Sequence, residues 1–167
     1  MMGRQVCSRF RPLRLKSNVG FGADVATLDD AGNRELVEMS WGFRTPAVSK
    51  KTGKPIKPNA WNNARDDKLL ISGLWKASFI KRRCLMPVSS LNETKGQQPA
   101  TDYWFVMNGE GDDDRPPFAI AGLWRQEQED LLDPDHARRV HTMVTTEANE
   151  LVGSIHVKNR MPVILHP

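Results

Sequence analysis

The sequence predicts an α+β fold: a single β-rich domain over residues 1–167, with a curled, largely antiparallel, barrel-like sheet and a few short helices. Three observations support this prediction. A chain of 167 residues suits one domain, which buries roughly two thirds of its unfolded surface. Several short apolar runs, rich in β-branched and aromatic residues, are separated by turn residues. Segments whose apolar residues follow helical spacing are few and short.

The first half of the chain predicts a strand, a loop and a helix. Glu35–Phe43 alternates partly between apolar and polar residues and predicts a strand, preceded by a turn at Asp30–Asn33. Ala47–Asn59 is rich in Lys, Gly and Pro, so we expect a loop suited to contact with a polyanion. Asp66–Lys81 carries apolar residues close to helical spacing and predicts a helix, which Gly73 weakens.

The second half predicts further short strands, which are Arg83–Val88, Tyr103–Met107, Phe118–Trp124, Val140–Thr145 and Val163–Leu165. Two of them, Tyr103–Met107 and Phe118–Trp124, flank an acidic turn, so we expect them to pair as a hairpin. A helical turn is expected at Thr146–Ser154.

Charge is distributed unevenly along the chain. Residues 1–83 hold 17 Lys and Arg against 7 Asp and Glu, a net charge of +10, whereas residues 84–167 hold 7 against 13, a net charge of −6. Clustered cations displace counterions from phosphates, so this asymmetry is typical of nucleic-acid binding. A solvated bipolar surface would have the same composition, and charge alone leaves both interpretations open.

Composition argues against several other classes of protein. No window approaches the ~18 consecutive apolar residues of a membrane-spanning helix, and the N-terminus lacks a secretory signal, so no membrane association is expected. Cys7 and Cys84 are too few for a disulfide framework or an all-cysteine zinc site. We expect free thiols and a cytoplasmic location. Neither phosphate-binding glycine motifs nor histidines at metal spacing occur, so no metal and no organic cofactor is predicted.

Four residues have both a chemical and a structural interpretation. Cys7 lies among arginines that favour its thiolate, although a lone exposed cysteine is usually inert. His156 lies between apolar residues and a proline-containing segment, which suits either acid–base chemistry or a structural role. Glu93 stands in a polar stretch typical of a solvated loop, and Asn63 fits a turn or helix cap. The residues alone leave these alternatives open.

Seven segments in a fixed order add to this interpretation: Cys7-Ser8-Arg9-Phe10, Trp41-Gly42, Asn63-Ala64-Arg65, Lys81–Pro87, Phe118–Trp124, Thr145–Glu150, and Ile155-His156 with Arg160–Leu165. Together they resemble the SOS-response-associated peptidase (SRAP) family, whose members share this order of motifs. The resemblance covers nearly the whole chain, and it is the order of seven motifs rather than any one of them that is specific.

The resemblance implies a protein that crosslinks to abasic sites in single-stranded DNA. In the family, loss of the initiator methionine leaves cysteine as the first residue. Its α-amine condenses with the aldehyde of the ring-opened deoxyribose to an imine, and its thiolate then closes a thiazolidine ring. Both groups are available near pH 7, because a free α-amine is partly neutral there and nearby arginines lower the pKa of a thiol.

Residue roles follow from the resemblance by motif. Cys7 would be the nucleophile, and Asn63 would orient the amine and the sugar. Glu93 would shuttle protons during imine formation, and His156 would act as general acid or base in ring opening or reversal.

The resemblance also implies DNA contacts. Arg9, Arg65 and Arg160 match the family's phosphate-contacting positions. Trp41 would stack on a base or support a DNA bend, and a core position at a strand end explains this residue equally well.

The sequence departs from the family pattern at three places. Cys7 follows Met1–Val6, and Val6 stands where the family has its initiator methionine, so we expect residues 1–6 to be a non-native leader and the native chain to begin at Cys7. The segment Ser90–Thr94 keeps the acid but lacks the family's aromatic neighbours. The chain ends at Pro167, where family members continue, so we expect the C-terminal part of the family domain to be missing.

The leading hypothesis is a monomeric, nucleoid-associated protein whose partner is single-stranded DNA containing abasic sites, which it crosslinks through Cys7. Two alternatives remain open. One is a module that binds single-stranded DNA without a covalent bond. The other is a thiol autopeptidase that uses Cys7, His156 and Glu93.

Overall fold

The computed structural model describes residues 9–12, 22–96, 99–109, 115–127, 139–155 and 158–165, with the backbone alone for 9–12 and 22–24. The strands in these ranges are β1 (Arg9–Pro12), β2 (Gly22–Leu28), β3 (Arg34–Trp41), β4 (Phe43–Val48), β5 (Pro55–Trp61), β6 (Asn63–Arg65), β7 (Arg83–Lys95), β8 (Thr101–Phe105), β9 (Phe118–Gln126), β10 (Arg139–Glu147), β11 (Arg160–Pro162) and β12 (Ile164–Leu165). The helical segments are η1 (Asp66–Lys68), α1 (Lys76–Lys81) and α2 (Glu150–Gly153).

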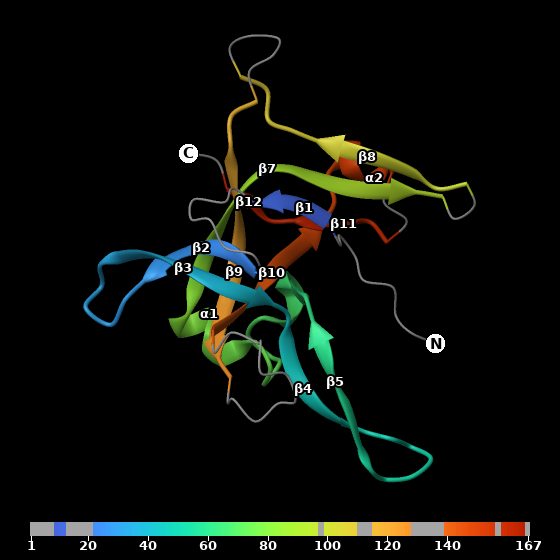
Figure 1. The fold of residues 1–167 in the computed structure, drawn as a ribbon. Coiled ribbons are helices and arrows are strands. Elements are labelled where there is room, and N and C mark those ends of the chain that lie inside the picture. The colour runs from blue at the N-terminus through green and yellow to red at the C-terminus, as the bar shows by residue number, and fades with distance from the viewer. Residues whose placement is uncertain are drawn as a thin grey trace.

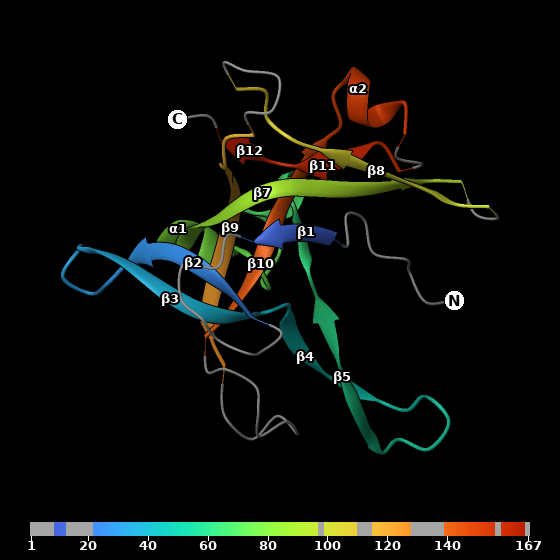
Figure 2. The same ribbon diagram turned by 45° about the horizontal axis from the view of Figure 1, so that its top comes forward.

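Strand pairing follows a closed circuit. β7 pairs with β2, β2 with β3, β3 with β10, β10 with β9, and β9 with β7 again. Figures 1 and 2 show these strands curling around one another. Most pairings are antiparallel, but β10 runs parallel to β3 and to β6. The predicted α+β class, with a curled and largely antiparallel sheet and short helices, is confirmed.

Two groups of buried side chains fill the core. The first contains Val25, Met39, Cys84, Met86, Val88, Leu91, Phe118, Ile120 and Met143. The second contains Phe43, Ala64, Leu69, Trp75, Leu123, Val140 and Val144. Each group draws residues from both the basic and the acidic half of the sequence, so neither half builds a core of its own.

The strand expected at Arg83–Val88 is much longer in the structure. β7 continues to Lys95, and its buried residues extend through Ser90, Leu91, Asn92 and Glu93. Its first half pairs with β9, and its second half pairs with β1 on one edge and β8 on the other. Sequence analysis did not predict the second half as a strand because its residues are mostly polar. In the structure β1 and β8 pair with it, one on each edge.

The expected hairpin between Tyr103–Met107 and Phe118–Trp124 is therefore wrong. Both segments form strands, β8 and β9, but each pairs with a different half of β7 rather than with the other. β7 is long enough to pair with both strands. β8 and β9 therefore pair with β7 and not with each other, although consecutive strands usually pair.

The helix predicted over Asp66–Lys81 forms only at its two ends, as η1 and α1. Leu70, which supplied part of the helical spacing, is 59% exposed, and its neighbour Ile71 is 72% exposed. A helix in a protein depends mainly on burying one apolar face, and these two side chains are mostly exposed. Gly73 adds the backbone freedom that disfavours a helix.

The loop predicted over Ala47–Asn59 is instead a β-hairpin, which we call the β4–β5 arm. β4 and β5 form a separate two-stranded sheet, with Phe43 opposite Trp61 and Val48 opposite Pro55. Figure 1 shows the arm projecting from the curled sheet. Pro46, Pro55 and Pro58 hid these strands from sequence analysis, but proline is tolerated where a strand edge has no partner.

Other local predictions are confirmed. Strands form at β3, β9, β10 and β12, and α2 supplies the helical turn, capped by the Asn149 side chain, which accepts from Val152 N. β3 and β4 meet at Gly42, whose φ of 103° lies in the left-handed region and whose N–H donates to His141 O at 2.8 Å. A side chain at Gly42 would also lie 2.6 Å from Asn62 Oδ1, so the corner requires glycine.

Gly122 in β9 provides a test of how tightly the sheet packs. A Cβ atom there would lie 2.9 Å from Cys84 Sγ and 3.1 Å from the backbone oxygen of Thr142. Gly122→Ala should lower the free energy of unfolding by about 1–3 kcal/mol, because the backbone contact cannot move aside. The urea midpoint measures this loss.

Gly73→Ala is the matched control, because a Cβ atom at Gly73 meets no atom within 4 Å. It should leave the midpoint unchanged or raise it slightly. Equal midpoints for Gly122→Ala and the unaltered protein would contradict the packing argument.

Candidate nucleic-acid interface

The carboxyl-terminal end of β10 has a neighbouring strand on each edge. Thr145 pairs with Arg65 of β6 on one edge and with Pro162 of β11 on the other. β6 also carries Asn63, and β11 begins at Arg160. Because neighbouring strands lie about 4.8 Å apart, this pairing brings Asn63, Arg65 and Arg160 into one region although nearly 100 residues separate them in sequence.

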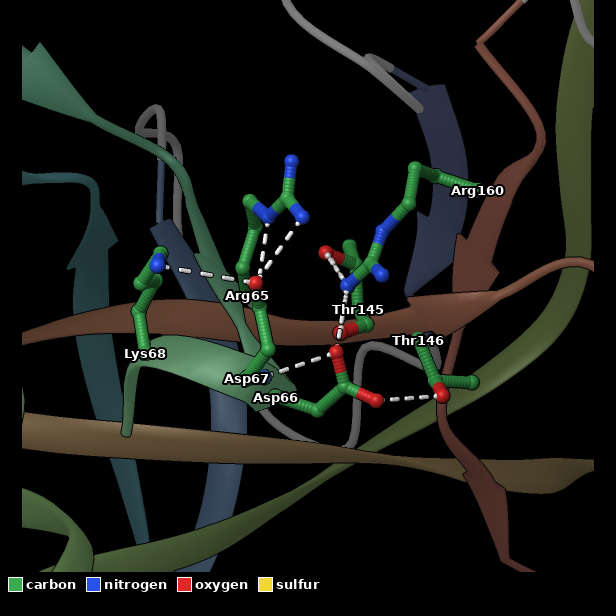
Figure 3. Close-up of polar contacts among 7 residues, drawn as sticks. All are labelled: Arg65, Asp66, Asp67, Lys68, Thr145, Thr146 and Arg160. Atoms are coloured by element: carbon green, nitrogen blue, oxygen red, sulfur yellow. Dashed lines mark hydrogen bonds and ion pairs between the residues drawn. The ribbon is translucent and has the colours of Figure 1, made fainter. Parts of the chain in front are cut away.

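Asp66 links the two edges, as Figure 3 shows. Its Oδ1 accepts a hydrogen bond from Arg160 Nη2 at 2.8 Å, and its Oδ2 accepts one from Thr146 Oγ1 at 2.6 Å. Arg160 Nη2 also donates to the backbone oxygen of Thr145 and to its hydroxyl, the latter at 3.3 Å. The Arg160 side chain is only 14% exposed. Protein atoms therefore fix the position of this guanidinium group before any ligand arrives.

Arg65 lies at the surface of the same region. Its Nε donates to Asp67 Oδ1 at 2.9 Å and its Nη2 to Asp67 Oδ2 at 3.0 Å, a bidentate pair. Lys68 Nζ lies 3.8 Å from the same carboxylate. The side chain of Arg65 is 59% exposed. It is thus oriented by its neighbour but open to solvent, in contrast to Arg160.

The pKa of Asp66 reflects these contacts. The hydrogen bond from Thr146, followed by that from Arg160, lowers it from 3.8 to about 2 although partial burial opposes the change. The pKa of Asp67 is also lowered, chiefly by the hydrogen bonds from Arg65. Both carboxylates are therefore ionised near neutral pH.

Trp41 supports the segment that leads into β6. Its half-buried indole packs against the first core group, and its Nε1 donates to Asn62 O at 3.1 Å, directly before Asn63. This is the structural role that sequence analysis weighed for Trp41. A stacking contact with DNA remains a prediction.

Glu93 lies in a different setting from the one expected. The polar stretch around it was interpreted as a solvated loop, but Glu93 is in β7, opposite Tyr103 of β8, and only 2% of it is exposed. Its neighbour Asn92 pairs with Arg9 at the start of β1 and donates from Nδ2 to Tyr103 O at 3.3 Å. A carboxyl group buried between two edge strands is a stronger candidate for chemistry than a solvated one.

The structure describes some of the predicted site residues and not others. It brings Asn63, Arg65 and Arg160 together around the end of β10. Cys7 and His156 lie outside the described residues, and Arg9 is described by its backbone alone.

Burial shifts the pKa of two other titratable groups, Cys84 and His141. Burial raises the pKa of the Cys84 thiol to about 12, and it lowers the pKa of His141 to about 4, so both are neutral near pH 7. Cys84 belongs to the first core group, where it packs as a small apolar residue.

The described ranges hold neither a cluster of metal ligands nor a membrane-spanning helix. No group of three or more His, Cys, Asp or Glu there is arranged to hold a metal ion. No helix in the same ranges is long and apolar enough to cross a membrane.

Sequence analysis missed the contribution of Asp66, Thr145 and Thr146. Asp66 directly follows the Asn63-Ala64-Arg65 motif, and the two threonines open the Thr145–Glu150 motif, so their positions beside predicted site residues were the available signal. The hydrogen bonds between them join residues 80 positions apart, which no local pattern reveals.

Comparison with known proteins decides the family. A sequence model described as SOS response associated peptidase (SRAP) matches residues 5–167. The chain belongs to the SRAP family. The resemblance based on seven ordered motifs is thereby confirmed.

Two relatives in Bacillus subtilis (strain 168) are similar to this SRAP chain. The abasic site processing protein YoqW is 29% identical over 150 residues, which cover 89% of this chain and 61% of the relative. The abasic site processing protein YoaM is 28% identical over 142 residues, which cover 84% of this chain and 57% of the relative. The chain thus spans about three fifths of the length of the curated relatives it matches.

Solved structures resemble the SRAP chain in fold. A protein from Bacteroides thetaiotaomicron has a TM-score of 0.61 at 22% identity, with 87% of this chain and 59% of the other covered. A protein from Bordetella bronchiseptica has a TM-score of 0.63 at 20% identity, with 87% and 68% covered. At this level of identity the likeness supports the fold alone.

The Asp66 contacts of the SRAP chain predict a dependence of stability on pH. Because the pKa of Asp66 is lower in the folded chain, its stabilising effect is complete above pH ~5 and is lost as the pH falls toward 2. Asp66→Asn should lower the free energy of unfolding near pH 7 by about 1 kcal/mol, after allowance for the 41% exposure of the side chain.

The difference between Asp66→Asn and the unaltered protein should shrink toward zero near pH 2, as measured by urea unfolding at a series of pH values. Asp67→Asn is the control, since its ion pairs are with the exposed side chains of Arg65 and Lys68, and it should show a smaller effect. A difference that stays constant from pH 7 to pH 2 would refute the role of the charged carboxylate.

Proposed function

We propose that this chain binds single-stranded DNA and crosslinks abasic sites as a thiazolidine through Cys7, which shields the lesion. Membership of the SRAP family and relatives named for abasic site processing support this proposal. The observation that carries it in the structure is the pairing of β1. Arg9, two residues after Cys7, lies opposite Asn92 and so beside the buried Glu93.

The required reach is short. Two residues of extended chain span at most about 7 Å. A cysteine two positions before Arg9 therefore stays within about 7 Å of the Arg9 backbone, which lies opposite Asn92, the residue before Glu93. The proposal also requires a free α-amine on Cys7, because a nitrogen that is already part of a peptide bond cannot form an imine.

The reaction balances without an oxidant or a cofactor. The Cys7 amine adds to the aldehyde carbon of the ring-opened sugar, and loss of one water molecule forms the C=N bond of the imine. The thiolate sulfur then adds to the same carbon while the nitrogen takes up a proton. One water molecule leaves, and no electrons are transferred.

Protein groups supply proton transfer and position. Glu93 would pass protons during addition and dehydration, which a buried carboxyl group can do once substrate excludes the remaining water. His156 would serve ring opening or reversal, and Asn63 would orient the amine and the sugar.

The DNA strand would be held by charged and aromatic groups. Arg9, Arg65 and Arg160 would contact its phosphates. Arg160 is the preorganised member, because Asp66 and Thr145 already hold it. Trp41 would support a base or the bend of the strand.

Crosslinking by Cys7 is tested with protein that begins at this residue. We expect it to give a heat-resistant shift on a denaturing gel with an oligonucleotide whose single uracil has been excised. Cys7→Ala retains the amine but not the thiol, so it should give no heat-resistant product. Protein that still carries residues 1–6 should also give none. An equal shift from Cys7→Ala would end the thiazolidine proposal.

Proton transfer by Glu93 is tested separately from DNA binding. Glu93→Gln should slow crosslinking by about 100-fold and leave the affinity for intact single-stranded DNA unchanged, as measured by fluorescence anisotropy. Glu150→Gln, at an exposed position in α2, is the matched control and should not slow the reaction. A Glu93→Gln protein that reacts at the original rate while melting at the original temperature would exclude the proton-transfer role.

Binding of single-stranded DNA without a covalent bond is the second candidate function. The exposed lysines of the β4–β5 arm favour it, because they could hold DNA whether or not Cys7 reacts. Salt-dependent binding by protein that gives no crosslink would select this function.

A further inference from the structure

The candidate interface itself carries little net charge. Arg65, Lys68 and Arg160 supply three positive charges, but the ionised carboxylates of Asp66 and Asp67 pair with them, which leaves +1. Affinity for nucleic acid depends mainly on cations that replace the counterions of phosphates. The attraction for a DNA strand must therefore come largely from another surface of the chain.

The β4–β5 arm is the strongest candidate for that surface. Lys50, Lys51, Lys54 and Lys57 are all exposed, and residues 42–65 contain no Asp or Glu. Among the described residues, none of these four lysines forms an ion pair. Their charges are therefore available to a ligand, whereas those of Arg65 and Arg160 are partly neutralised.

The arm has a defined shape. The N–H of Ser49 donates to Lys54 O at 2.9 Å, and that of Gly53 donates to Ser49 O at 2.8 Å, which closes the turn. At its base, Phe43 is fully buried, with its ring centroid 5.3 Å from that of Trp75 and the Arg125 guanidinium 4.5 Å above it. A hairpin closed at its tip and anchored at its base holds the backbone of its lysines in a defined arrangement.

The arm is also continuous with the candidate interface. β5 ends at Trp61, and β6 begins at Asn63. Figure 2 shows the arm extending away from β10 on the side opposite β7 and β8. The arm thus leads directly into β6, and a DNA strand bound at Asn63 and Arg65 would meet the arm as the adjoining surface of the protein.

We propose that the β4–β5 arm is a second DNA contact, which grips the phosphate backbone of the strand flanking the reactive site. This inference rests on the proposed function, because the location of the site defines the flank. Lys57 lies six residues before Asn63, a distance of at most about 20 Å in extended chain. Phosphates of a duplex strand are spaced about 3.4 Å apart along the helix axis, so on a duplex flank the contact falls within roughly 6 nucleotides of the DNA bound at Asn63.

Because the arm between Phe43 and Trp61 has lysines but no aromatic residues, it is suited to bind the phosphate backbone of DNA rather than the bases. Residues 44–60, which include the turn, contain no Phe, Tyr or Trp, so the arm offers no platform on which bases could stack. The contact should accordingly be independent of base sequence and strongly dependent on salt.

The test measures binding of intact DNA, which needs no crosslinking chemistry. Fluorescence anisotropy over a salt series would compare the unaltered protein with Lys54→Gln/Lys57→Gln, using a labelled single strand of about 20 nucleotides and a partial duplex of the same length, which both exceed the reach. Two lost phosphate contacts should reduce the salt slope by about 1.4 on the single strand or about 1.8 on the duplex. The affinity at 0.1 M salt should fall roughly 20- to 60-fold.

The matched control removes the same charge elsewhere. Lys76→Gln/Lys81→Gln, at exposed positions in α1, should leave the slope unchanged. A loss confined to the partial duplex identifies a duplex flank as the ligand of the arm, and a loss on both substrates identifies the phosphate backbone of either.

Three results would overturn the inference. These are an unchanged slope in Lys54→Gln/Lys57→Gln, an equal loss in the control pair, or lysine-dependent binding to anionic phosphatidylserine vesicles in place of DNA. Failure of the proposed function has a different signature. Protein beginning at Cys7 would then form no crosslink even where the arm variants show the expected loss of DNA affinity.

Discussion

Hydrogen bonding along both edges of β10 is the constraint on which the candidate interface depends. One edge pairs first with β3 and then with β6, and the other pairs first with β9 and then with β11. Thr145 consequently has Arg65 across one ladder and Pro162 across the other. The separation between the two arginine-bearing strands is then set by backbone geometry rather than by flexible side chains.

The strands that sequence analysis predicted have either a mainly apolar run, such as Phe118–Trp124, or a partial alternation of apolar and polar residues, such as Glu35–Phe43. In β9 and β10, every residue except the last is buried or half-buried. Prediction failed where burial and polarity disagree. The second half of β7 is polar but covered by strands on both edges, whereas Leu70 and Ile71 are apolar but exposed. In each case long-range pairing decides the outcome, and a local pattern contains no information about it.

The site was predictable to a similar degree. Motif order indicated Asn63, Arg65 and Arg160, but it gave no account of how Arg160 is held. That account depends on Asp66, whose carboxylate both orients the arginine and cancels its charge. A guanidinium group held by a carboxylate offers a ligand a defined binding geometry. Because its charge is neutralised, it attracts distant phosphates only weakly. In the proposed DNA complex, the β4–β5 arm attracts the phosphate backbone and the end of β10 positions the bound strand.

The prolines of the arm bear on how copies of the chain meet one another. A projecting two-stranded hairpin has two open edges, and an open edge is a template on which a strand from another molecule can add. Pro46, Pro55 and Pro58 have no N–H to offer such a strand, and the neighbouring lysines repel a second arm of the same charge. The same residues that concealed the hairpin in the sequence therefore protect it from aggregation.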